Sequence, residues 1–175
     1  KIKIFAPDNA AESCHFNPLY GIKSMTVTER RIFIEQIAYI LVQDEKDGKY
    51  FTDGARDFFC GISLYLLNND INTTFPDIVS AILHGNAIDW VMTIRSSQCS
   101  EAQEYTNSFY QTNEKNVAGV YQNLSKSVRP FSNGDLAKLL DGKGNCITPE
   151  CLERGFDVYI KLPQDKINVY APITT

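Results

Sequence analysis

Hydrophobic and polar positions follow one pattern at the two ends of the chain and another between them. Residues 1–5 and 156–162 have strand-like patterns, and a proline, Pro7 or Pro163, stops each run. Between these runs, apolar side chains recur every three or four positions, which is the spacing of amphipathic helices. The pattern predicts a mainly α fold: a compact bundle of about seven short helices with two short terminal strands.

The two longest helices of the first half are expected to form the core. Thr26 to Glu29 has the sequence of a capping box, and the helix that it opens runs to about Gln43. Apolar residues cover most of its circumference, so we expect it to be largely buried. The next helix covers roughly 51–68 and carries Phe58 on its most apolar face. We expect this second helix to be central.

The clearest amphipathic helix begins at Asn113-Glu114 and ends near Pro130. One side is an apolar stripe made of Val117, Val120, Tyr121, Leu124, Val128 and Phe131. Lys115, Gln122, Lys126 and Arg129 fall on the opposite side. Short helices are also expected after Thr74, Asn86, Ser100, Ser132 and Thr148, with the start of a last helix at 164–170.

Two strands that flank a purely helical middle are typical of a helical insertion between strands of a larger sheet. The chain begins without Met inside a strand-like run. We therefore interpret it as a piece of a longer protein, so the sequence leaves open whether the whole protein has a targeting or anchoring segment. In the isolated piece, the two strands are free to pair with each other.

Composition narrows the class of protein. The chain has 175 residues, of which 43% are hydrophobic and 22% charged, as in ordinary globular domains, and no run has the length of a membrane-spanning helix. The net charge of −4 disfavours a dedicated nucleic-acid binder, although a chain with this net charge can still contain a local basic stripe. The five cysteines are an odd, irregularly spaced set, which favours a reducing, cytosolic setting over a disulfide framework.

Most of the residue patterns that could form a phosphate-binding, catalytic or metal site are better explained by a structural role. Gly142-Lys143-Gly144 lacks the Ser or Thr and the preceding strand of a phosphate-binding loop. Cys14-His15 is a Cys–His pair without a surrounding signature. Cys146 and Cys151 lack the further ligands of a zinc site. No catalytic, cofactor-binding or metal-binding residue is therefore assigned.

Two charged patterns are left. Asp53 and Asp57 lie one helical turn apart beside Arg56, and we interpret them as a solvated helix face. Lys115, Lys126 and Arg129 form a basic stripe on the helix described above, and these residue types contact phosphates and partner proteins. This stripe is the candidate contact surface for a partner protein or DNA.

Four segments in order along the chain form one further pattern. They are 1–7 with 15–19, 54–59 with 64–67, 127–132 with the short Leu-rich helix after it, and 157–163 with 165–166 and 170–172. Together they resemble the TraG-type coupling proteins of type IV secretion and conjugation, which are membrane-anchored, hexameric, RecA-like ATPases. The resemblance spans nearly the whole chain, and the third and fourth segments in tandem are the most specific.

The resemblance implies that the chain is the all-alpha domain of such an ATPase, inserted after the Walker A loop and before the Walker B strand. Residues 21–155 would be that domain, and 1–20 and 156–175 would be flanks left from the ATPase sheet. The implied role is recognition of a relaxase or of relaxosome accessory proteins at the cytoplasmic face of the cell membrane, without ATPase activity of its own. The acidic balance places protein recognition ahead of weak DNA binding.

Two other functions stay open at this point. In the first, the chain is a helical DNA-binding regulator whose helix from Lys115 to Arg129 reads DNA. In the second, it is a Cys-dependent enzyme with a low thiol pKa at Cys14 beside a histidine.

Overall fold

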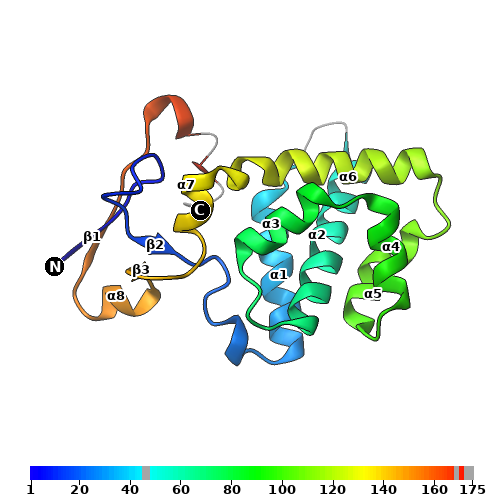
Figure 1. Ribbon diagram of the computed structural model, residues 1–175, viewed down its shortest axis with the longest axis horizontal. Coiled ribbons are helices and arrows are strands. Elements are labelled where there is room, and N and C mark those ends of the chain that lie inside the picture. Colours follow the sequence, from blue (N-terminus) through cyan, green and yellow to red (C-terminus); the bar gives the residue numbers. More distant parts are fainter. Residues whose placement is uncertain (45–47, 168–169, 172–175) are drawn as a thin grey trace. The chain divides into compact units, whose positions relative to one another are not determined.

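The computed structural model describes residues 1–44, 48–167 and 170–171. The described part is mainly helical, which confirms the predicted class, and it contains eight α-helices (Figure 1). They are α1 (Val27–Leu41), α2 (Lys49–Asn69), α3 (Phe75–His84), α4 (Ala87–Ser96), α5 (Ser100–Thr106), α6 (Glu114–Val128), α7 (Gly134–Leu139) and α8 (Pro149–Glu153). The strands are β1 (Ile2–Phe5), β2 (His15–Phe16), β3 (Cys146–Ile147) and β4 (Asp157–Ile160).

The chain divides into two compact units. The terminal unit consists of 1–21, 74–76 and 130–175, and the helical unit consists of 22–73 and 77–129. Residues 130–155 thus cluster with the chain ends. The domain boundaries predicted from the sequence, at 20 and 155, stay a prediction.

The terminal unit contains two parallel strand pairs. β1 and β4 pair in parallel, with Ile2 opposite Asp157 and Phe5 opposite Ile160. The shorter strands β2 and β3, which the sequence pattern did not predict, form a second parallel pair. In this second pair too, one strand precedes α1 and the other follows α7. Segments near the two ends of the chain are therefore paired at two places.

The helix α2 is the centre of the helical unit, as predicted, and it packs against α1, α5 and α6 (Figure 1). Phe58 is fully buried, stacks on Phe109 with ring centroids 4.4 Å apart, and meets Tyr121 edge to face. Glycines allow the close approach of two neighbouring helices. A Cβ at Gly61 would lie 2.6 Å from the Thr106 side chain, and one at Gly54 would lie 2.8 Å from Val120.

The expectation that the first long helix is largely buried is wrong for one of its faces. The capping box at Thr26 forms, and Ile34 and Ala38 are fully buried on the side of α1 that packs on α2. Ile32 and Tyr39, which lie outside that buried side, are 50% and 63% exposed. A helix that packs on one neighbour buries one face only, whatever the hydrophobicity of the rest.

The last predicted helix, 164–170, is observed only in part. Gln164–Lys166 forms a 3₁₀ turn, and residues 168–169 lie outside the described residues, as do 45–47 of the acidic loop between α1 and α2. Within the described ranges, no helix combines the length and apolar character that a bilayer crossing requires.

Candidate functional site

The basic stripe lies on α6 and on the residue that follows it, within the helical unit. Asn113 caps the N-terminus of α6, where its side chain accepts a hydrogen bond from the backbone N–H of Lys115. Four apolar side chains of the predicted stripe are fully buried: Val117, Val120, Leu124 and Val128. This burial fixes the rotation of the helix about its axis.

Because that side is committed to the core, Lys115, Lys126 and Arg129 are all exposed on the opposite side. A helical rise of 1.5 Å per residue places the first and last of them about 20 Å apart. No ion pair is formed by the ammonium groups of Lys115 and Lys126 with any residue of the described part. The stripe is an exposed row of positive charge on an acidic protein.

The Cys14-His15 pair of the terminal unit does not form a nucleophile–base contact. The imidazole Nδ1 of His15 lies 3.1 Å from a carboxylate oxygen of Asp141. Cys14 is buried, and its sulfur accepts a hydrogen bond from the Asn145 side-chain amide at 3.4 Å. Neighbouring residues of an extended strand point in opposite directions, which accounts for the two separate sets of partners.

The other two cysteines of this unit also have structural partners. Thr148 caps α8 from the expected position, and its backbone N–H lies 3.5 Å from the sulfur of Cys151. The sulfur of Cys146 lies 3.6 Å from the carbonyl oxygen of Lys143. Among the residues that the structure describes, no group of three or more His, Cys, Asp and Glu side chains could hold a metal ion.

The helical unit contains a cavity of about 560 Å³ that the sequence did not reveal. Helices α1, α2 and α5, together with Asp44 after α1, form its walls. The lining residues are Glu35, Ala38, Tyr39, Asp44, Lys49, Asp53, Arg56, Asp57, Cys60 and Tyr105. Most of them carry a charge or a polar aromatic group.

Arg56 is a buried cation of this cavity with several partners in the protein. It is 7% exposed, and its guanidinium donates two hydrogen bonds to the carbonyl oxygen of Val42, at 3.0 and 2.7 Å. It also lies 2.9 Å from a carboxylate oxygen of Asp44 and 3.3 Å from one of Asp53. The ring of Tyr39 lies beneath it, with 4.2 Å between the guanidinium carbon and the ring centroid. The charge of Arg56 is thus fully compensated within the protein.

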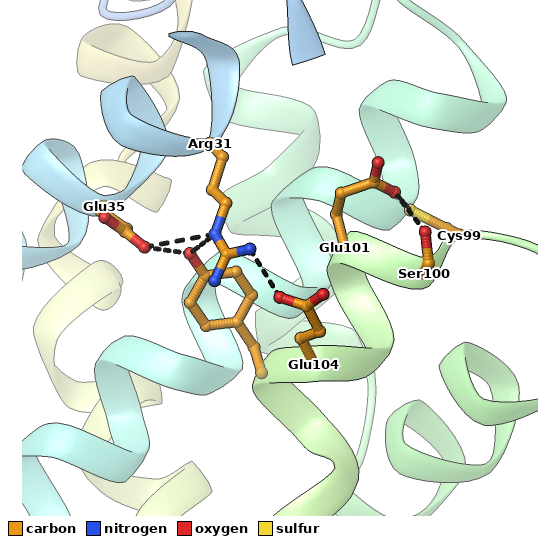
Figure 2. A network of polar contacts seen from close by, with 7 residues as sticks. Arg31, Glu35, Cys99, Ser100, Glu101 and Glu104 are labelled. Carbon is orange, nitrogen blue, oxygen red and sulfur yellow. Dashed lines mark hydrogen bonds and ion pairs between the residues drawn. The ribbon is translucent and has the colours of Figure 1, made fainter. Parts of the chain in front are cut away.

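A second guanidinium, that of Arg31, contacts two of the lining residues, Glu35 and Tyr105. Figure 2 shows Arg31 between Glu35 and Glu104, at 3.6 Å from the first carboxylate and 2.5 Å from the second. Its Nε also donates to the hydroxyl of Tyr105 at 2.9 Å, and that hydroxyl donates in turn to the Glu35 carboxylate. Burial, followed by the hydrogen bond to Glu35, raises the pKa of Tyr105, so the phenol stays neutral.

Asp57 differs from the other acidic residues of the cavity. Within the described ranges, its carboxylate has neither an ion pair nor a hydrogen bond. Burial, and then the negative charges of Asp53 and Glu35, raise the pKa of Asp57 to about 6. The prediction of a solvated helix face is therefore wrong for Asp57, which lies in the cavity between α1, α2 and α5, whereas the side chain of Asp53 is 48% exposed.

Comparison of the sequence with protein-family models and with curated proteins finds no match. Function must therefore be argued from the residues and their arrangement.

Proposed function

We propose that this chain is the substrate-recognition region of a TraG-type coupling ATPase of conjugative type IV secretion. It binds a relaxase or relaxosome accessory proteins, and DNA weakly. In this proposal, the helices belong to the all-alpha domain, and β1 and β4 are neighbouring strands of the RecA-like ATPase sheet. The parent protein is a membrane-anchored hexamer, and this region lies at the cytoplasmic face of the cell membrane.

The observation that carries the proposal is the pairing of β1 with β4. These strands lie at opposite ends of the chain, yet they are parallel neighbours in register from Ile2 and Asp157 to Phe5 and Ile160. Parallel neighbours require a crossover connection, and here the crossover contains all eight described helices. An insertion between two adjacent strands of a larger parallel sheet would have this topology.

The exposure of this strand pair also supports the proposal. Ile2, Tyr159 and Ile160 are about half exposed or more, although they are strand residues of apolar character. A two-stranded pair is marginally stable on its own and normally forms part of a wider sheet. Further strands or helices of an ATPase domain would cover these side chains.

The basic stripe Lys115, Lys126 and Arg129 is the proposed contact surface. Because the net charge of the chain is −4, its long-range attraction to DNA is weak. The stripe is therefore better matched to a local acidic patch on a partner protein than to a polyanion such as DNA. The chain is not expected to hydrolyse ATP alone, since the nucleotide-binding residues of the resembled family have no counterpart here.

The test compares a stripe variant with a matched control. In the stripe variant, Lys115, Lys126 and Arg129 are replaced by Ala; in the control, the exposed Lys138, Lys143 and Lys161 of the terminal unit are replaced instead. Both variants lose three positive charges. Each is tested for binding to purified relaxosome proteins that are encoded beside the gene for this chain.

The proposal expects the stripe variant to lose binding to at least one of these proteins while the control keeps it. A parallel DNA titration at two salt concentrations tests the rival DNA-binding regulator. That function requires tight binding that falls steeply with salt and depends on the stripe. If both variants bind every relaxosome protein equally well, the stripe is not the contact surface.

A further inference from the structure

Among the described residues that line the cavity of the helical unit, the carboxylate of Asp57 has neither a hydrogen bond nor an ion pair. In the part of the chain that the structure describes, the lining contains four carboxylates, from Glu35, Asp44, Asp53 and Asp57, and two cations, Lys49 and Arg56. Arg56 is engaged by Val42, Asp44 and Asp53, and Glu35 by Arg31 and Tyr105. Asp57 is left facing the cavity without a partner among the described residues.

The shape and the walls of the cavity restrict what could bind there. Its volume of about 560 Å³ lies within the range of small-ligand pockets. Tyr39 and Tyr105 supply aromatic walls, and each already lies against a guanidinium of the protein itself, at 4.2 and 5.0 Å. Aromatic faces beside carboxylates are a favourable environment for organic cations.

Other classes of ligand fit less well. An anion would approach the carboxylates of Glu35, Asp53 and Asp57, and Arg56, the buried cation among the described lining residues, is already paired. A metal ion requires several ligands at short range, and the described residues do not provide such a group.

We propose that this cavity binds a guanidinium or alkylammonium group carried on a flexible chain, with Asp57 as its counter-charge and Tyr39 and Tyr105 as walls. An arginine or lysine side chain of a partner protein has this chemistry, and so does a free amine. The inference does not depend on the coupling-protein proposal, because it uses only the residues of the cavity.

The titration of Asp57 is consistent with this inference. Burial, and then the negative charges of Asp53 and Glu35, penalise the ionised carboxylate, which raises its pKa to about 6. A bound cation would favour the ionised form, so binding should release a proton near pH 6 and strengthen as the pH rises from 5 to 7. Among the described residues, the charged and titratable groups that line the cavity with Asp57 are Glu35 and Tyr39 from α1, Asp44 after α1, Lys49, Asp53, Arg56 and Cys60 from α2, and Tyr105 from α5.

The experiment titrates the ¹⁵N-labelled chain with butylguanidinium, with butylammonium and with a capped Gly-Arg-Gly peptide, and follows amide chemical shifts by NMR. We expect saturable shifts confined to the lining of the cavity. The Asp57→Asn variant should bind the guanidinium about tenfold or more weakly, as expected for loss of a charge-assisted contact. Asp57→Glu should retain binding, and Asp89→Asn on α4, an exposed carboxylate outside the cavity, is the matched control for charge.

The source of the cation follows from the relative affinities. Tighter binding of the peptide than of butylguanidinium points to a protein partner, and equal binding points to a small amine; both agree with the proposal. The proposal is overturned if no probe gives saturable shifts at the cavity, or if Asp57→Asn binds like the parent. If that variant does not fold, the pH dependence of the parent chain is the test. Butylguanidinium binding that is no stronger at pH 7 than at pH 5 would contradict Asp57 as the counter-charge.

Discussion

Replacing Asp57 with Asn should stabilise the protein at neutral and alkaline pH. The pKa of Asp57 is about 6 in the folded chain, against an ordinary value of 3.8. The folded state therefore holds this proton more tightly than the unfolded state. In consequence, the contribution of Asp57 to the free energy of unfolding falls as the pH rises from about 4 to about 6, and stays low above that.

The size of the effect follows from the shift. A shift of about two pKa units corresponds to about 3 kcal/mol, and partial exposure of the carboxylate to water reduces this to about 1–2 kcal/mol. Asn has nearly the same shape and cannot ionise. At pH 8 the variant should therefore be more stable than the parent by about 1–2 kcal/mol, and at pH 4 the difference should almost vanish.

Urea unfolding followed by fluorescence measures this difference. Trp90, the only tryptophan of the sequence, lies in α4 within the helical unit and reports on the unit that contains Asp57. The Asp89→Asn variant is the control for loss of one exposed charge. A variant that is less stable than the parent at pH 8, or equally stabilised at pH 4 and pH 8, would refute the assignment of Asp57 as an unpaired, partly buried carboxylate.

Three further predictions concern packing and surface. Phe58→Ala should lower the free energy of unfolding by about 3–5 kcal/mol, because it removes a fully buried ring at the centre of α2; an unchanged melting temperature would contradict that packing. Gly61→Ala should also destabilise the helical unit in a urea titration, since the new methyl group would lie 2.6 Å from the Thr106 side chain, whereas Gly134→Ala on α7, with open space around it, should not. Replacing Lys115, Lys126 and Arg129 together by Ala should change the stability by less than about 0.5 kcal/mol for each residue, and a markedly lower melting temperature would mean that the stripe has a structural role.

Local patterns in the sequence predicted much of the secondary structure. The capping box at Thr26, the cap at Asn86 and the Thr148-Pro149 start of α8 are observed, because these signals depend on residues three or four positions apart. The alternation at both ends also predicted β1 and β4. Two-residue strands such as β2 and β3 have no periodicity to detect, so their pairing could only come from the tertiary structure.

Of the two candidate sites, the sequence predicted the one that depends on a single helix and not the one that depends on tertiary packing. The exposed stripe on α6 was predictable, since one amphipathic helix contains both its buried and its exposed side. The cavity was not, because Glu35, Asp57 and Tyr105 come from three helices whose packing the sequence does not specify. The Asp53–Asp57 spacing was visible, but nothing local indicated that α1 and α5 would enclose Asp57.

The central claim is that the helices form an insertion between two adjacent strands of an ATPase sheet. Its most direct test is to sequence the gene on both sides of the region that encodes this chain. The account predicts a phosphate-binding loop of the type GxxxxGK[ST] upstream of Lys1 and an acidic Walker B strand downstream of Thr175. A gene whose flanking sequence contains neither motif would contradict the claim, and the parallel pairing of β1 with β4 would then need another explanation.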